Sequence, residues 1–279
     1  MARQITANEK REYMIQYREL TQIFRSLPIP ENRPIILHVS DPSLEKIQGG
    51  AKTFLGTAMV VFPRLMMPAF TYQTMVFPSH GPKDNGVEYN NPPLDNQKAV
   101  FFHPLLPVSN KVGRTPEIFR NLPDVQRSSH PILSFCGREL DQALQSQSLS
   151  KPYAPLANLA KQEGWVLLID LDQTSNFSIH YALYRGGRNL FTRWALTSAG
   201  VKTCPHFPGC SEGFNQIKPH LEKFMYSTKT AALTIKAVPI TDLQKVVQRL
   251  LTQNPLTLLC DKEHCLRCES IRARAKRKL

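Results

Sequence analysis

The side chains with the most specific spacing are the cysteines near the end of the chain. Cys265 and Cys268 form a C-x-x-C pair, Cys260 precedes them, and Cys204 and Cys210 supply two more thiols upstream. Thiolates at C-x-x-C spacing are frequent ligands of structural zinc. We therefore expect one tetrahedral zinc ion here, with Cys210, or else Cys204, as the fourth ligand. Because only one C-x-x-C is present, unrelated thiols that lie near one another stay an alternative.

A second group with chemical potential is the imidazole of His180. Trp165–Leu171 is an uninterrupted apolar run, which predicts a strand in the middle of a sheet covered on both faces, and Asp172–His180 follows its carboxyl end. In open α/β sheets, sites gather outside the carboxyl ends of strands. An imidazole titrates near neutral pH and can act there as a general base. A histidine that only fills the core is the plainer interpretation.

A third cluster is continuous in the sequence. Arg127–His130 places a cation, two hydroxyls and an imidazole in four consecutive positions. That combination suits holding an anion or shaping the wall of a pocket. His130 has an equal claim to a structural role, and we expect His38 and His103 in the core or in turns.

The elements that would position these residues alternate between strand and helix. Residues 8–27 carry apolar groups at the helical period, and Pro34–Val39 is short and β-branched like a buried strand. Gly49–Val61 follows as a helix and Leu65–Phe70 as a second strand. Ser79–Gln97 is a polar loop rich in Pro, Gly and Asn, of the length usual for functional lids.

Composition excludes several classes of protein. The chain has 279 residues, of which 42% are hydrophobic and 20% charged, as in a globular protein. Its longest apolar stretches fall well short of the ~20 residues that cross a bilayer, and the start of the chain lacks the pattern of a secretory signal. We expect a cytosolic protein that makes no use of a membrane.

The chain is basic, with a formal net charge of +13. Nucleic acid, an anionic membrane surface and a phosphorylated small molecule would all suit that sign. Residues 269–279 carry five Lys or Arg and one Glu, but a short basic tail is common. Binding of nucleic acid therefore ranks last among the functions considered.

Short motifs follow one another in order over roughly residues 8–265. The first are Leu37–Ser40, Gly49–Gly50 and Met67–Tyr72. The middle ones are Ser109–Gly113, Pro116–Arg120, Leu122–Val125, Arg127–Pro131 and Pro155–Leu159, and the last are Ser175–His180 and Gly209–Phe214. In this order they resemble the antibiotic N-acetyltransferases of the aminoglycoside 3-N type.

The resemblance implies a fold and an activity. The fold would be a single α/β domain over residues 1–279, with helices in layers around a central mixed β-sheet and a Cys-rich, basic segment at about 260–279. The activity would be transfer of an acetyl group from acetyl-CoA to an amine of an aminoglycoside-like or other small-molecule acceptor. Coenzyme A and that acceptor would be the partners.

The resemblance also implies roles for individual residues. His180 would be the general base and Thr71 a donor to the thioester oxyanion. Small or hydroxyl side chains would let the backbone approach the cofactor, and a cation would hold its phosphates. The cofactor-binding residues would be Ser40, Gly49, Gly50, Ser109 and Arg127.

Two departures from the family pattern bear on activity. A glutamate normally lies three residues after the catalytic histidine, where this chain has Leu183, and Asp170–Asp172 replaces a glycine-rich turn. Asp172 is the candidate to orient His180 instead. Without a glutamate at 183, this basic chain suits a neutral or anionic amine better than a polycation. A second hypothesis is that the chain is a catalytically impaired relative that keeps the fold and acts as a coenzyme-A-binding or regulatory protein.

Overall fold

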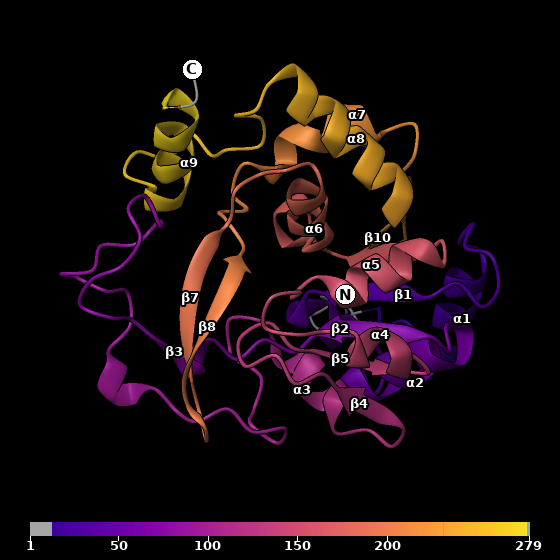
Figure 1. Cartoon of the computed structure of the whole chain (residues 1–279). Coiled ribbons are helices and arrows are strands. Elements are labelled where there is room, and N and C mark those ends of the chain that lie inside the picture. Colours follow the sequence, from indigo (N-terminus) through magenta and orange to yellow (C-terminus); the bar gives the residue numbers. More distant parts are fainter. Residues whose placement is uncertain (1–12, 231, 278–279) are drawn as a thin grey trace, which may run out of the picture.

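The central element is a seven-stranded mixed β-sheet with the strand order β4-β5-β2-β1-β6-β10-β9 (Figure 1). The computed structural model describes residues 13–230 and 232–277. The strands are β1 (Ile35–Val39), β2 (Leu65–Pro68), β4 (Val125–Arg127), β5 (Phe135–Arg138), β6 (Trp165–Ile169), β9 (Tyr226–Lys229) and β10 (Thr234–Pro239). β1 pairs in parallel with β2 and β6, and the remaining pairs are antiparallel.

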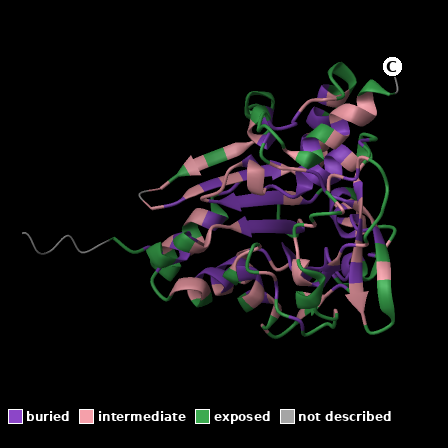
Figure 2. Cartoon of the chain, turned by 90° about the vertical axis from the view of Figure 1, so that its left-hand side faces the viewer, coloured by how far each residue is buried: buried purple, intermediate pink, exposed green. Residues whose placement is uncertain are grey.

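The apolar runs of β1 and β6 explain why both faces of the sheet are covered. Successive strand residues point to opposite faces, so Ile36 and Leu168 join one hydrophobic cluster while Ile35 and Leu167 join the other. All four side chains are at most 1% exposed. Figure 2 shows the central strands buried between layers whose outer surfaces are exposed.

Helices form a layer on each face. The face of Ile35 is covered by α1 (Tyr17–Arg25), α2 (Gly50–Val61) and α3 (Arg114–Arg120). The face of Ile36 is covered by α4 (Asp141–Gln145), α5 (Ala154–Lys161), α6 (Ser178–Arg185), α7 (Lys218–Leu221) and α8 (Ile240–Gln253). The last helix, α9 (Leu266–Lys276), joins the same hydrophobic cluster through Cys268 and Ile271. This arrangement confirms the predicted α/β fold with helices around a mixed sheet.

A second, smaller antiparallel sheet lies beside the first, in the order β3-β7-β8 (Figure 1). Its strands are β3 (Met75–Val76), β7 (Phe191–Thr197) and β8 (Gly200–Phe207). The loop predicted at Ser79–Gln97 extends from β3 towards α9. Two contacts join them: the Gly86 N–H donates to Ser270 Oγ at 3.1 Å, and Asp84 forms an ion pair with Arg277.

The predicted elements near the start of the chain are found with shorter bounds. The helix expected over residues 8–27 is α1, which begins at Tyr17, and residues 8–12 of that prediction lie outside the described part. The strand expected at Leu65–Phe70 ends at Pro68. No helix within the described ranges is both long and apolar enough to cross a membrane.

Candidate active site

A cavity of about 1050 Å³ lies where the carboxyl ends of β1, β2 and β6 meet the second sheet. Val39 and Asp41 line it after β1, Phe70 and Tyr72 after β2, and Thr174 after β6. These three strands are parallel neighbours, so their carboxyl ends lie at one edge of the sheet. The loop at residues 79–97 and the start of α9 complete the wall.

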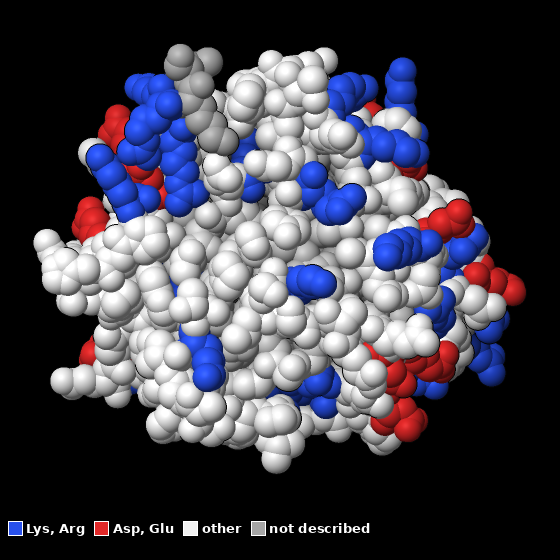
Figure 3. Space-filling model, in the orientation of Figure 1, with Lys and Arg blue, Asp and Glu red and all other residues white. Residues whose placement is uncertain are grey.

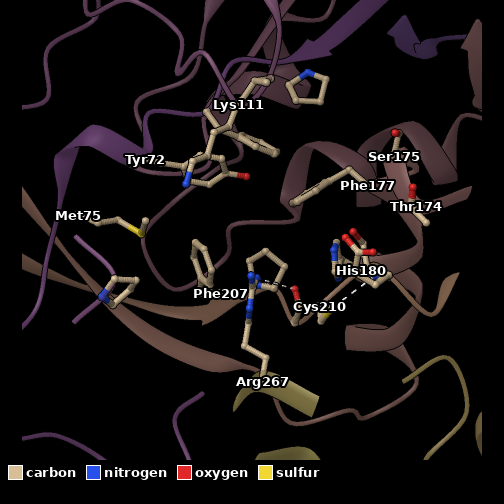
Figure 4. Close-up of a pocket in the computed structure, with 18 of the residues that line it drawn as sticks. Tyr72, Met75, Lys111, Thr174, Ser175, Phe177, His180, Phe207, Cys210 and Arg267 are labelled. Carbon is tan, nitrogen blue, oxygen red and sulfur yellow. Dashed lines mark hydrogen bonds between the residues drawn. The ribbon is translucent and has the colours of Figure 1, made fainter. Parts of the chain in front are cut away.

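His180 lies at this cavity on the first turn of α6, near the ring of Phe177 (Figure 4). Its ring centroid is 5.4 Å from that of Phe177 and 4.7 Å from that of Phe214, and the residue is 6% exposed. Burial, assisted by the positive charges of Arg267 and Arg188, lowers the pKa of His180 to about 3. The imidazole is therefore neutral at pH 7, as a general base must be.

Nothing in the described chain holds the His180 ring in one tautomer. Its Nδ1 is buried and has no hydrogen-bond partner. Leu183, one turn further along α6, is 2% exposed and packs in the apolar core. The carboxylate of Asp172 accepts hydrogen bonds from Thr174 N at 2.9 Å and Asn215 Nδ2 at 2.6 Å, not from His180. Asp172 thus shapes the turn after β6, and no contact supports the orienting role expected of it.

Thr71 faces away from the cavity. It is fully buried, its Oγ1 donates to the Pro131 carbonyl at 2.7 Å, and its N–H donates to the Ile132 carbonyl at 2.9 Å. Both donors expected to meet an oxyanion are therefore engaged within the protein. The next residue, Tyr72, lines the cavity instead, and burial raises its pKa to about 12, so its hydroxyl stays protonated.

None of the expected cofactor-binding residues is among those that line the cavity. Ser40 lies between Val39 and Asp41, which do line it, and Ser109 precedes the lining loop Asn110–Gly113. Gly49 and Gly50 begin α2 in the left-handed conformation, with φ of 82° and 57°. At Gly49 a Cβ would lie 2.3 Å from Thr53 Oγ1, so this pair serves the turn into the helix.

Arg127 uses its guanidinium to join loops inside the protein. Nε donates to Ser134 Oγ at 3.1 Å, Nη2 to the Ala69 carbonyl at 2.6 Å, and Nη1 to the Leu106 carbonyl. Burial lowers the pKa of Arg127 to about 10. The cation that the sequence assigned to the cofactor thus holds residues 104–106 against the end of β2.

The cavity also contains cations that sequence reasoning missed, namely Lys111, Arg193 and Arg267. Arg193 is 4% exposed and donates to the Asn85 carbonyl at 3.0 Å, and Arg267 donates to the Gly209 carbonyl at 3.0 Å. Neither arginine forms an ion pair with a described acid. The only signal in the sequence was the position of Arg267 inside Cys265-x-x-Cys268.

The carboxylates of the cavity are engaged elsewhere or lie at its mouth. Asp41 accepts hydrogen bonds from the N–H groups of Arg114 and Thr115 at the start of α3. Glu212 pairs with Lys262 at 2.8 Å, and Glu88 is an exposed residue of the cavity lining. The surroundings of His180 are therefore electropositive.

Four cysteines meet beside the cavity. The sulfur atoms of Cys210, Cys260, Cys265 and Cys268, hereafter the cysteine cluster, all lie within 4.8 Å of one another. Of the two candidates for the fourth thiol, the structure brings Cys210 to this cluster, whereas Cys204 is buried on β8 with its thiol directed to the Lys202 carbonyl. All six cysteines are free thiols.

Comparison with known proteins decides the family. The family described as "Aminoglycoside 3-N-acetyltransferase" matches residues 36–252. The chain belongs to this family. One relative is the SPbeta prophage-derived aminoglycoside N(3')-acetyltransferase-like protein YokD of Bacillus subtilis (strain 168), 27% identical over 180 residues. That match covers 60% of this chain and 64% of YokD, so the chain spans somewhat less than two thirds of that relative.

Solved structures of acetyltransferases share the fold. Aminoglycoside acetyltransferase AAC(3)-IVa superimposes with a TM-score of 0.77 at 20% identity, covering 94% of this chain and 99% of that enzyme. A mutant of the same enzyme was solved in complex with a gentamicin. AAC-IIIb, solved with CoASH, gives a TM-score of 0.68 at 15% identity over 86% of this chain and 97% of its own.

Proposed function

We propose that this chain is an acetyl-CoA-dependent N-acetyltransferase in which His180 is the general base. The observation that carries the proposal is a neutral imidazole at a large cavity, where the carboxyl ends of three parallel strands converge. Membership of the acetyltransferase family supports acetyl transfer, and the CoASH bound to AAC-IIIb supports the cosubstrate. The identity of the acceptor and the role of His180 are part of the proposal.

Acetyl-CoA would supply an activated thioester, whose carbonyl carbon is attacked by the acceptor amine. The C–N bond forms, the C–S bond breaks, and coenzyme A leaves as a thiolate. The amine loses a proton that His180 accepts and then passes to this thiolate, which gives free coenzyme A thiol. Nε2 is the nitrogen available for this proton, because Nδ1 is enclosed by the protein. Tyr72, protonated and at the same cavity, is the hydroxyl donor we assign to the developing oxyanion.

We expect the reaction to be slow. A base with a pKa of about 3 removes a proton weakly, and a buried Nδ1 without a partner neither fixes the tautomer nor stabilises the imidazolium. The same observations favour the second candidate, a relative that binds coenzyme A without turning it over. A measurable rate with an amine acceptor separates the two.

The acceptor we propose is a neutral or anionic amine. A polycation would meet Arg267 and Arg193 in the same cavity, with no described carboxylate paired to either of them. One like-charge contact at ~6 Å and an effective dielectric constant of ~20 costs on the order of 3 kcal/mol, or about a hundredfold in affinity. The gentamicin complex of AAC(3)-IVa therefore describes that enzyme's acceptor and is a weak guide to this one.

For the cofactor we propose the side of the cavity formed by Val39–Asp41 and Asn110–Gly113. Ser40 and Ser109 remain proposed cofactor-binding residues, because their sequence neighbours line this side of the cavity. Lys111 is a cation on the same side that we assign to a phosphate of the cofactor. Calorimetry with acetyl-CoA tests this placement. Absence of measurable heat at millimolar cofactor would contradict both candidate functions.

The decisive experiment measures release of coenzyme A thiol with a panel of amines: an aminoglycoside, a neutral monoamine, an amino carboxylate and an amino phosphate. His180→Ala should abolish turnover of the best acceptor. Binding of acetyl-CoA without turnover of any amine would favour the non-catalytic candidate, and fastest turnover of the aminoglycoside would overturn the proposed acceptor class.

Three further expectations stay predictions. The zinc ion belongs to the proposal as a structural group at the cysteine cluster and takes no part in acetyl transfer. The cytosolic location and the single domain rest on the sequence alone.

A further inference from the structure

We propose that the cysteine cluster binds one zinc ion, and that this ion fixes the wall of the cavity by joining the loop after β8 to the start of α9. The metal site stands on the positions of the four thiols and does not depend on the acetyltransferase activity. Its consequence for the cavity rests on the proposed function.

The spacing of the sulfur atoms matches a tetrahedral site. Zinc–sulfur bonds of ~2.3 Å place tetrahedral sulfurs ~3.8 Å apart. The four sulfurs of the cluster lie within 4.8 Å of one another, and those of Cys260 and Cys268 are 3.4 Å apart. Small side-chain rotations therefore bring all four to one ion. A disulfide would need ~2.05 Å, and none is formed.

The backbone around the cluster favours thiolates. Cys265 is the N-cap of α9 and Cys268 lies in its first turn, where the helix dipole stabilises negative charge. The Glu212 N–H donates to Cys210 Sγ at 3.4 Å. Because thiolates are the form that binds zinc, both features act in favour of metal binding.

The charges around the cluster provide an independent argument. Arg188 is 9% exposed and donates to the carbonyls of Pro255 and Thr257, and Arg272 donates to the Cys260 carbonyl at 2.6 Å. Neither forms an ion pair with a described acid, and neither does Arg267. Figure 3 shows basic side chains gathered over α9. Zinc with four thiolates carries a net charge of −2, which these cations would balance, whereas four neutral thiols leave the buried Arg188 uncompensated.

Close packing holds the segments together before any metal binds. A Cβ at Gly213 would lie 2.5 Å from the carbonyl carbon of Leu259, so the loop after β8 lies directly on the backbone preceding Cys260. The cluster is therefore part of the fold and not a chance approach of mobile thiols.

The same segments form one wall of the cavity. Pro208–Glu212 and His264–Arg267 both line it, and Arg267 lies between two of the proposed ligands. In Figure 4 its side chain extends from the start of α9 into the cavity, with Cys210 nearby. An ion bound by Cys265 and Cys268 would fix the position from which Arg267 reaches the acceptor.

Metal analysis of full-length protein purified without chelator and under reducing conditions tests the site. We expect about one zinc per chain, less than about a tenth of that in Cys268→Ala and Cys210→Ala, and no change in Cys136→Ala. Cys136 is a matched control, since it is as fully buried as Cys268 but lies in the other hydrophobic cluster. Zinc near zero in the wild type after addition of zinc, iron in its place, or two disulfides by mass spectrometry would overturn the site.

Hydrogen exchange tests the effect on the cavity without relying on activity. Chelation should accelerate amide exchange in residues 208–212 and 264–267 at least tenfold and leave β6 unchanged, and added zinc should restore protection. Equal exchange with and without zinc would refute the role in the wall. Bound zinc with no turnover of any amine would refute only the proposed function, and turnover by wild-type protein that takes up no zinc would refute only the metal site.

Discussion

Leu183→Glu tests whether His180 lacks a carboxylate partner. Side chains three residues apart on a helix are neighbours, with Cβ atoms ~5–6 Å apart. A carboxylate ~5 Å from the imidazole, at an effective dielectric constant of ~20, stabilises the imidazolium by roughly 3 kcal/mol. That energy corresponds to about two pKa units. The pKa of His180 would thus rise from about 3 to roughly 5.

This change in basicity sets the size of the expected effect. If about half of the gain is expressed in the transition state, turnover rises about tenfold. The substitution also buries a charge, because Leu183 is 2% exposed among apolar side chains, so we expect a loss of several kcal/mol in the free energy of unfolding. We therefore expect an enzyme that is faster, as measured by release of coenzyme A thiol, and less stable, as measured by thermal melting.

Leu183→Gln is the matched control, since it has nearly the same shape and no charge. It should lower stability without raising turnover. If Gln accelerates the reaction as much as Glu, or if His180→Ala in either background leaves turnover unchanged, His180 is not the general base and the electrostatic account is refuted.

Three other perturbations follow from the structure. Burial lowers the pKa of His38 and of His130 to about 4, and it is the largest cause that lowers the pKa of His180 to about 3. Because the ordinary value is 6.5, the unfolded chain binds more protons than the folded chain below pH 6.5. The free energy of unfolding should therefore be greatest above pH 6.5 and fall as the pH drops, by up to ~1.4 kcal/mol per histidine per pH unit. His130→Gln should reduce this slope by about one proton, measured by urea titrations at about pH 4.5–6.5, and an unchanged slope would contradict the prediction. Gly213→Ala should lower the free energy of unfolding by about 1–3 kcal/mol and also lower the zinc content, because the new Cβ meets the backbone of Leu259. Gly209→Ala is the control: its Cβ would have no contact closer than 3.7 Å, so its thermal melting should be nearly unchanged. Arg267→Ala should raise the KM of an anionic amine about tenfold or more, while Lys276→Ala, an exposed cation of the same helix, should leave it unchanged; equal effects would assign the loss to overall charge.

The parts of the fold that the sequence predicted are those specified by local pattern. The apolar run of β6 and the helix that the Gly49–Gly50 pair opens are visible residue by residue. The bounds of β2 were less accessible, since Ala69 and Phe70 are as buried as the strand but leave its pairing with β5. Burial alone does not distinguish a strand from the loop that continues it.

The candidate site was predictable in place but not in its individual contacts. His180 follows the carboxyl end of β6, and that position is readable from the sequence. Whether Thr71 or Tyr72 faces the cavity depends on the direction of the chain after β2, which contacts with Pro131 and Ile132 determine. The partners of Arg127 and the choice of Cys210 over Cys204 likewise depend on loops that are remote in the sequence.

The two outer strands of the central sheet bear on how the protein behaves at high concentration. β4 and β9 leave one side of their backbone without a partner strand in the described chain, and such edges invite pairing with another molecule. Both strands are short, at three and four residues, and β9 also ends in the exposed Lys229. A short edge is a poor template for a further strand, and a positive charge on it makes pairing less favourable still. The sheet is therefore expected to resist edge-to-edge aggregation.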